Sequence, residues 1–242
     1  MLEAFCMAPD VSIVIPALNE EKRIKTTLEF LRKQQFEGTI EIILADGYSK
    51  DKTVEIAKSF VDKVVLEKVR RISVERQSGA KAATGKIIAF TDADSQAPNN
   101  WVQSIWNAFE KNPKASFVYG PVFVHDVPKW EMVLDKIAMK IMLQFFHWIG
   151  NFSPIGSNIA LPKKVFNQIG GFDTSMVTCE DLELAKRAQK AGKLVYDSKV
   201  TMTVSARRIK EWGYSKYVWF HLTNGYKFHK TGRGRDHYED VR

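Results

Sequence analysis

The stretch that decides the fold is Lys86-Ile87-Ile88-Ala89-Phe90-Thr91-Asp92-Ala93-Asp94-Ser95-Gln96. An apolar run that ends in two carboxylates predicts a buried strand leading into a polar loop. Alternating strand residues point to opposite faces, so Asp92 and Asp94 reach one ion only if the strand has already turned into a loop. Such hard oxygen ligands favour Mg²⁺ or Mn²⁺. A simple turn is the alternative, because Asp and Ser are common turn residues.

The segments before this stretch alternate between strand and helix patterns. Strands are predicted at 11–15, 40–45, 63–66 and 86–90, with helices at 20–34, 51–60 and 73–84. Apolar strands separated by helices indicate an α/β fold with a mostly parallel sheet covered on both faces. Ligands bind such sheets beyond the carboxyl ends of the strands. Those ends carry 16–20, Asp46 and 92–94, so the three polar segments are expected to share one crevice.

The second half of the chain is less regular. It predicts a strand at 116–124, a long helix at 128–149, a strand at 158–161, helices after Pro162 and at 180–191, and two short strands near Leu194 and Val200. No internal repeat or linker interrupts this pattern. A chain of 242 residues is long enough for one large α/β domain with a substantial core.

The composition points to an anionic partner and an intracellular setting. The net charge of +8 suits sugar phosphates, nucleotides or acidic lipids, and without a nucleic-acid motif no nucleic-acid partner is expected. Cys6 and Cys179 lack metal-binding spacing, which favours free thiols in a reducing compartment. Neither a signal peptide nor an apolar run of about 20 residues is present, so we expect a cytoplasmic protein.

Four further residues are candidates for a site. Glu20, in a segment that lacks the glycines of a P-loop, is expected to line a base or ribose pocket. Asp46 can accept hydrogen bonds from a base or a ribose hydroxyl. Arg76 would help to neutralise a diphosphate, with a surface arginine as the alternative. Asp181 opens a helix whose dipole keeps a carboxylate ionised, as a general base requires, although acidic residues favour helix starts anyway.

The order and spacing of these motifs resemble family 2 glycosyltransferases of the GT-A fold. The motifs are VSIVIPALNEE at 11–21, ADGYSKDKT at 45–53, RQSGAKAATGKIIAFTDAD at 76–94, GGFD at 170–173 and CED at 179–181. The resemblance implies transfer of a sugar from a UDP- or GDP-linked donor, with inversion at the anomeric carbon. It also implies a single GT-A domain, with a nucleotide-sugar half at about 10–96, an acceptor half at about 97–205, and a basic aromatic C-terminal helix and tail at 206–242.

The resemblance also assigns roles to individual positions. These are Pro16, Ala17, Glu20 and Asp46 for the nucleoside, Arg76 for the diphosphate, Asp92 for the ribose and the metal, Asp94 for Mn²⁺ or Mg²⁺, and Asp181 for the general base. Polyprenyl-phosphate sugar synthases within the family carry DADxQ, and this chain reads DADSQ, so Gln96 is a candidate third metal ligand. The same likeness makes a polyprenyl-linked acceptor a candidate.

Two departures from the family pattern refine the expectation. The second strand commonly ends in two acidic residues, and Ala45 replaces the first of them. The Q-x-x-R-W pattern of processive enzymes is missing, so we expect single additions rather than polymerisation. The alternatives are a nucleotidyltransferase acting on sugar phosphates, which usually has a glycine-rich basic loop after the first strand, and a non-catalytic carbohydrate- or lipid-binding relic of the fold.

The helix predicted at 128–149 bears on the acceptor. It has a polar stripe, formed by Lys136, Lys140, Gln144 and His147, and a wide apolar arc, formed by Trp130, Met132, Met139, Ile141, Met142, Phe145, Phe146 and Trp148. The arc predicts either a core helix or a helix on a membrane surface. The basic aromatic C-terminal tract favours peripheral contact with the inner face of a membrane. His221 or His229 could add a metal ligand or a diphosphate contact, with a helix-surface role as the alternative.

Overall fold

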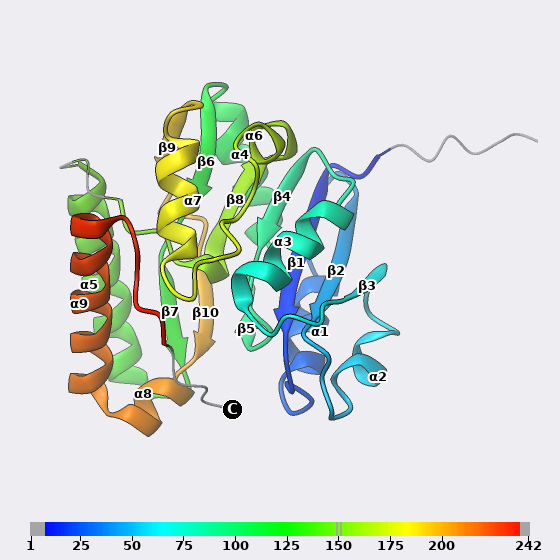
Figure 1. Ribbon diagram of the computed structural model, residues 1–242, viewed down its shortest axis with the longest axis horizontal. Helices are drawn as coiled ribbons and strands as arrows, with labels where there is room; N and C mark the ends of the chain where they lie inside the picture. The colour runs from blue at the N-terminus through cyan, green and yellow to red at the C-terminus, as the bar shows by residue number, and fades with distance from the viewer. Residues whose placement is uncertain (1–7, 149, 151, 238–242) are drawn as a thin grey trace, which may run out of the picture.

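The computed structural model describes residues 8–148, 150 and 152–237. Its centre is a seven-stranded sheet with the strand order β3-β2-β1-β4-β8-β6-β9 (Figure 1). The strands are β1 (Val11–Ala17), β2 (Ile40–Asp46), β3 (Lys63–Leu66), β4 (Ile87–Phe90), β6 (Ala115–Tyr119), β8 (Ile159–Pro162) and β9 (Lys193–Tyr196). β8 runs antiparallel to β4 and to β6, whereas the other neighbouring pairs are parallel.

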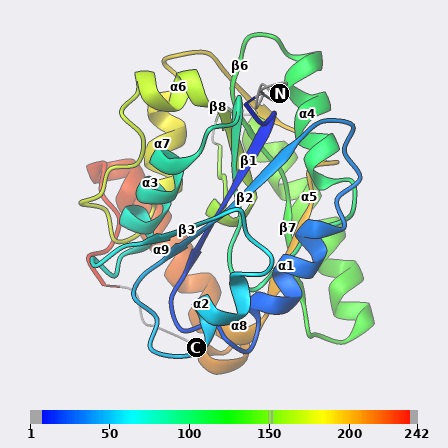
Figure 2. The ribbon, with the colours of Figure 1, turned by 90° about the vertical axis from the view of Figure 1, so that its right-hand side faces the viewer.

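Helices cover both faces of this sheet, as the sequence predicts. Successive residues of β1 point to opposite sides: Ile13 and Ile15 join a core beneath α1 (Ile24–Arg32), α2 (Thr53–Ala57) and α4 (Trp101–Lys111). Val14 joins a second core beneath α3 (Ile72–Ala82), α6 (Lys163–Gln168) and α7 (Glu180–Ala188). Figure 2 shows the two layers on either side of the sheet.

A second, smaller sheet lies beside the first and carries the C-terminal part of the chain. Its order is β5-β10-β7, formed by β5 (Ser95–Gln96), β10 (Met202–Ser205) and β7 (Val122–His125). Three more helices, α5 (Lys129–Trp148), α8 (Arg207–Trp212) and α9 (Tyr214–Thr231), lie on this side of the molecule (Figure 1). β5 directly follows the Asp-x-Asp loop, so the smaller sheet ties the C-terminal segment to that loop.

The α/β architecture and the mostly parallel sheet are confirmed, while two local expectations are wrong and one helix was not predicted. The segment 116–124 is two strands in different sheets, divided at Gly120, where a Cβ atom would lie 1.8 Å from the Val200 carbonyl oxygen. The first helix begins at Ile24 rather than Glu20, since 20–23 form a turn closed on the Glu20 carbonyl. The amphipathic helix α4 is absent from the expectations. Cys179 is a free thiol, and Cys6 lies outside the described residues.

Candidate active site

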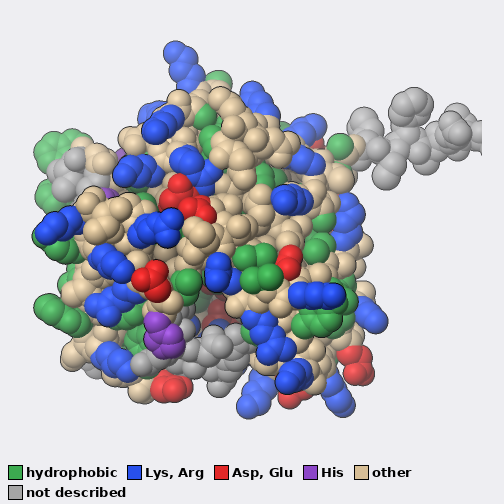
Figure 3. Space-filling view, in the orientation of Figure 1, with side chains coloured by type: hydrophobic (Ala, Val, Ile, Leu, Met, Phe, Trp, Pro, Cys, Tyr) green, Lys and Arg blue, Asp and Glu red, His purple; other side chains and the backbone are tan. Residues whose placement is uncertain are grey.

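The Asp-x-Asp segment forms a loop at the carboxyl end of β4. β4 ends at Phe90, and β5 begins only at Ser95, so both aspartates lie outside regular strand geometry, as expected. Ser95 closes the turn: its hydroxyl accepts a hydrogen bond from the Asp92 amide, and its own amide donates to the Asp92 carbonyl. The face shown in Figure 3 is hollowed below these strand ends. The turn thus presents both carboxylates at the edge of the sheet.

Asp94 lies against Glu20 and an arginine from the far end of the chain. The side chain of Asp94 is 9% exposed, and its Oδ2 lies 3.1 Å from Nε of Arg207. Nη1 of Arg207 donates to Oε1 of Glu20 at 2.7 Å, while Oε2 of Glu20 is buried without a hydrogen-bond partner among the described residues. Burial raises the pKa of Asp94 to about 6, with Arg207 opposing the shift and Asp92 and Glu20 adding to it.

Arg76 joins the Asp-x-Asp loop to the Glu-Asp pair of α7. Its guanidinium is buried, with Nη2 2.7 Å from Oδ1 of Asp92 and Nη1 2.5 Å from Oε1 of Glu180. The neighbouring backbone leaves little space, because a Cβ atom on Gly156 would lie 2.2 Å from Nη1. The structure therefore gives the two terminal nitrogens of Arg76 carboxylate partners, and contact with a diphosphate stays a prediction.

Asp181 is held in place by two backbone amides. Its carboxylate accepts hydrogen bonds from the Gly156 amide and from the Leu182 amide, both at 2.8 Å. Gly156 precedes β8, and because β8 is antiparallel, its beginning lies at the same sheet edge as the end of β4. Burial raises the pKa of Asp181, and burial together with the Asp181 charge raises the pKa of Glu180 to about 7. The pair therefore titrates above the ordinary carboxyl range.

The residues predicted for the nucleoside lie where β1 and β2 end side by side. Ala17 pairs with Asp46 in the parallel register, Pro16 precedes it within β1, and both strand ends are buried. The carboxylate of Asp46 accepts hydrogen bonds from the amide and the hydroxyl of Ser49, at 2.8 and 2.6 Å. These contacts order the 46–49 turn and leave further lone pairs on the carboxylate for a ligand.

The carboxylates of the loop after β4 suit a metal ion whose coordination is completed by substrate phosphates. No cluster of three or more His, Cys, Asp or Glu side chains with metal-site geometry occurs in the described part of the chain. Mg²⁺ and Mn²⁺ do not need one, since one or two carboxylates plus substrate phosphates commonly hold such ions. Gln96 follows on β5, where its carbonyl accepts a hydrogen bond from Thr203. The oxygen donors of Asp92 and Asp94 thus fit the predicted metal.

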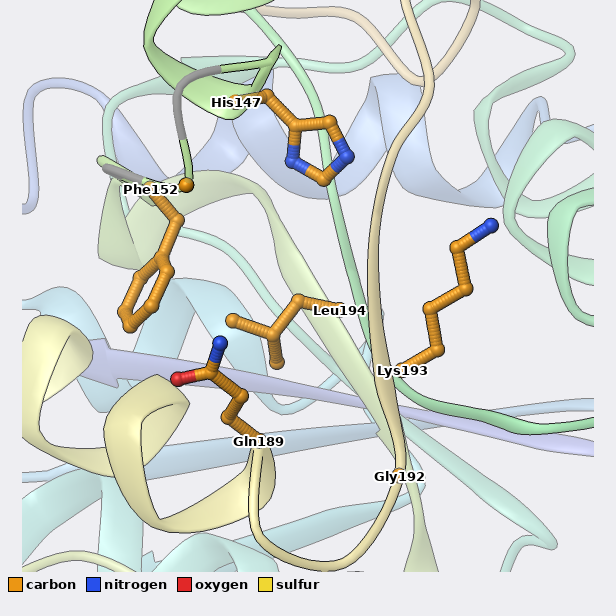
Figure 4. A pocket seen from close by; sticks show the side chains of 7 residues that line it. His147, Phe152, Gln189, Gly192, Lys193 and Leu194 are labelled. Atoms are coloured by element: carbon orange, nitrogen blue, oxygen red, sulfur yellow. The ribbon is translucent and has the colours of Figure 1, made fainter.

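The two histidines named as candidates lie along α9. The ring of His221 packs against Tyr217 and Phe220, and that of His229 packs against Phe228. A pocket of about 250 Å³ elsewhere is surrounded by His147, Phe152, Gln189 and Leu194 (Figure 4). None of the predicted site residues lines that pocket, so the carboxyl-end edge stays the candidate site.

Sequence reasoning missed two contributors to this edge, Arg207 and Gly156. Arg207 is separated from Glu20 by 187 positions, so no local spacing links them. The available signal is weak: Arg207 follows the strand predicted near Val200 by several positions and begins the basic C-terminal tract. Gly156 acts through its backbone amide, which sequence patterns do not reveal.

The strand order and this edge define the GT-A class of glycosyltransferase folds. The mannosyltransferase PcManGT from Pyrobaculum calidifontis, solved with GDP-Man and Mn²⁺, superposes with a TM-score of 0.68 at 18% identity over 95% of this chain and 67% of that one. Glucosyl-3-phosphoglycerate synthase from Mycobacterium tuberculosis, solved with Mn²⁺, UDP-Glc and phosphoglyceric acid, gives 0.64 at 15% identity over 94% and 82%.

The sequence model described as Glycosyl transferase family 2 matches residues 12–170, and the chain belongs to this family. A glucosyl-dolichyl phosphate glucuronosyltransferase from Haloferax volcanii is 28% identical over 187 residues, which cover 68% of this chain and 56% of the relative. Validoxylamine A glucosyltransferase from Streptomyces hygroscopicus subsp. limoneus is 25% identical, with coverages of 85% and 51%. The chain thus spans about half the length of these relatives. Fold and family agree with the expectations.

Proposed function

We propose that the chain transfers one sugar, with inversion, from a UDP- or GDP-linked donor to an acceptor, using Mn²⁺ or Mg²⁺. The observation that carries this proposal is the meeting of Asp92, Asp94 and Asp181 at one sheet edge, with Arg76 between Asp92 and the Glu-Asp pair. The relatives named above act on sugars, and two of the similar structures hold a nucleotide sugar with Mn²⁺. No comparable observation favours nucleotidyl transfer or a non-catalytic role.

The mechanism follows from how charge changes during transfer. The nucleoside would rest on the ends of β1 and β2, with Glu20 and Asp46 as acceptors of its hydrogen bonds. A bound metal would neutralise the charge that develops on the leaving diphosphate. Asp181, fixed by Gly156, would accept the proton of an acceptor hydroxyl as that oxygen attacks the anomeric carbon from the opposite side. If the acceptor is an anionic phosphate, Asp181 would mainly orient it.

Asp94→Asn is expected to abolish the metal dependence of nucleotide binding. The amide keeps the side-chain shape but loses the charge of a ligand to a hard cation, so Mn²⁺ should no longer improve the affinity for UDP or GDP. Calorimetric titration of both nucleotides with and without Mn²⁺ measures this effect, which we expect to be about tenfold or more. Asp62→Asn, which removes an exposed carboxylate paired with Arg32, is the matched control.

Release of UDP or GDP from a panel of nucleotide sugars then tests the reaction itself. Metal-dependent release that Asp94→Asn abolishes is the expected result. An Asp94→Asn protein that keeps the wild-type metal dependence would refute the assignment of Asp94. Absence of both nucleotide release and Mn²⁺-dependent nucleotide binding in the wild type would refute the proposed function.

We further propose that the acceptor is lipid-linked and that α5 rests on the membrane surface. The polar stripe of α5 contacts the protein: Lys136 and Lys140 each lie 5.9 Å from the ring centre of Phe123, and His147 bonds the Tyr119 hydroxyl at 2.9 Å. The apolar stripe is exposed instead, at Val133, Ile137, Ile141, Phe145 and Trp148. α5 is therefore no core helix on this side. Its exposed apolar stripe runs beside Lys136, Lys140 and Gln144, which are exposed too, so the outward side of the helix is amphipathic.

The surroundings of this stripe suit an anionic bilayer. On α9, Trp219, Leu222 and Tyr226 are also exposed, and Figure 3 shows hydrophobic and basic side chains along the edge where α5 and α9 lie. Aromatic residues among lysines and arginines are typical of membrane interfaces. Among the described helices none would cross a bilayer, since none combines sufficient length with sufficient hydropathy. The side chains of Trp130, Met132 and Phe146 are outside the described set.

The double variant Ile137→Glu/Ile141→Glu is expected to lose membrane binding. Both side chains are more than half exposed, so the fold should tolerate the charges, whereas insertion into a bilayer would not. Flotation with phosphatidylglycerol-containing vesicles should show a loss of about tenfold or more in the bound fraction. Leu66→Glu, at a similarly exposed apolar position on β3, should float like the wild type. Equal flotation of all three proteins, or none by the wild type, would contradict the proposal.

A further inference from the structure

Arg207 neutralises two carboxylates that belong to different parts of the candidate site. It is the first residue of α8, separated from the end of β10 by Ala206 alone, and its side chain reaches the loop between β1 and α1 and the loop after β4. The distances are 2.7 Å from Nη1 to Oε1 of Glu20 and 3.1 Å from Nε to Oδ2 of Asp94. One guanidinium thus holds the C-terminal segment against the nucleotide half.

These carboxylates need a cation whenever they are ionised. Glu20 and Asp94 are nearly buried, with side chains 7% and 9% exposed, and their charges repel each other. Leaving a buried charge unpaired is strongly unfavourable. Among the described residues, Arg23 forms an ion pair with Glu20 alone, its Nη1 lying 3.5 Å from Oε2, and its charge acts on Asp94 without such a contact. Arg207 therefore supplies, in this structure, positive charge to the carboxylate that is the candidate metal ligand.

We propose that Arg207 is an exchangeable cation that leaves Asp94 when a divalent metal binds there and then contacts the diphosphate. The inference rests on the proposed function, because it needs the metal on Asp94. A guanidinium and a metal compete for the same carboxylate. A bound diphosphate adds hydrogen-bond acceptors, and the planar guanidinium can donate two parallel hydrogen bonds to them. The charge of Arg207 thus stays in the site while its partner changes from Asp94 to the diphosphate, and α8 moves together with Arg207.

The exchange predicts effects of opposite sign on two ligands. Arg207→Gln removes the competitor, so Mn²⁺ alone should bind severalfold more tightly to the variant than to the wild type. With Mn²⁺ saturating, UDP and GDP should bind about tenfold more weakly, because a charge-assisted hydrogen bond to phosphate is lost. The free Mn²⁺ signal in electron paramagnetic resonance measures the first effect, and calorimetric titration measures the second.

Two further variants separate exchange from a structural ion pair. Arg23→Gln removes a cation from the same Glu20 but leaves the Asp94–Arg207 ion pair in place, and should change the Mn²⁺ affinity less than about twofold. Arg207→Lys keeps the charge but not the fork, so Mn²⁺ affinity should stay near that of the wild type while nucleotide affinity falls. If Arg207→Gln unfolds at a much lower temperature than the wild type, Arg207→Lys still tests whether the planar guanidinium is needed for nucleotide affinity.

The outcomes are distinct. If the wild type binds Mn²⁺ and nucleotide but Arg207→Gln weakens both, or changes neither, Arg207 is a fixed structural pair and the exchange is wrong while the proposed function stands. If the wild type binds Mn²⁺ neither alone nor with nucleotide, the metal-dependent function and the exchange both fail. Opposite shifts for the two ligands, absent in Arg23→Gln, support the exchange.

Discussion

Asp181→Asn is expected to lower kcat by about 10²- to 10⁴-fold, the range for loss of a positioned general base. The carboxamide oxygen can still accept the hydrogen bond from Gly156, so the loop before β8 should keep its place. Nucleotide affinity should change little, because Asp181 faces the acceptor in the proposed reaction. Initial rates of transfer and calorimetric binding of UDP or GDP measure the two quantities on the same protein.

The pH dependence provides a second readout of this assignment. A base acts only when ionised, and burial raises the pKa of Asp181 and brings that of its neighbour Glu180 to about 7. We therefore expect kcat/KM of the wild type to fall as the pH drops below neutrality. This fall should occur at a pH well above the ordinary pKa of an aspartate. The apparent pKa belongs to the pair rather than to either residue.

Glu183→Gln is the matched control for Asp181→Asn. It removes a carboxylate from the same helical turn, one that is ion-paired with Arg187, and should leave transfer unchanged. A loss below about tenfold in Asp181→Asn would contradict its role as a base. That result would fit an acceptor that is already an anion, such as a lipid phosphate, and would leave Asp181 with orientation alone.

Arg76→Met is expected to destabilise the fold by about 3–5 kcal/mol, the usual cost of breaking a buried ion pair by removing one partner. The methionine fills part of the volume but leaves Glu180 and Asp92 without their shared cation. The loss should grow as the pH rises, since Glu180, with its pKa already raised, can stay protonated at low pH and escape the penalty. Urea unfolding at pH 5 and pH 8 measures both effects.

Two companion variants test the cause of this loss. Arg32→Met removes an exposed ion pair with Asp62, both side chains being about two-fifths exposed, and should cost no more than about 1 kcal/mol. Adding Glu180→Gln to Arg76→Met should recover part of the stability and flatten its pH dependence. If Arg76→Met is as stable as Arg32→Met, the buried network is not what holds the two halves of the site together.

Much of the fold could be predicted because its signals are local. The apolar run before Asp92 and the alternation of strand and helix patterns fixed four parallel strands and the edge where their polar ends meet. The break at Gly120 was not predicted, since 116–124 has the pattern of one apolar strand. The close approach of the Val200 carbonyl, which explains the break, cannot be read from the sequence. The helix at 101–111 was not predicted either, although its apolar residues have helical spacing.

The site was predictable only as far as its residues lie in short motifs. Asp92, Asp94 and Asp181 come from such motifs and gather at one edge, while their chemical roles stay predictions. The ion pairs that organise them join residues 16, 104 and 187 positions apart. Pairing at such distances depends on how the chain packs, and a single sequence contains no local trace of it.

The reversed direction of β8 limits where this domain can accept changes in chain length. Gly156 lies at the entrance of β8, where its amide bonds Asp181 and a side chain on it would collide with Arg76. An insertion after Gly156 would shift the β8 register against β4 and displace Asp181 together with it. Among the described residues just ahead of Ile155, 150 and 152–154, no hydrogen bond to β8 or to Asp181 is present. We therefore expect changes in chain length ahead of Ile155 to disturb Asp181 less than changes between Gly156 and β8.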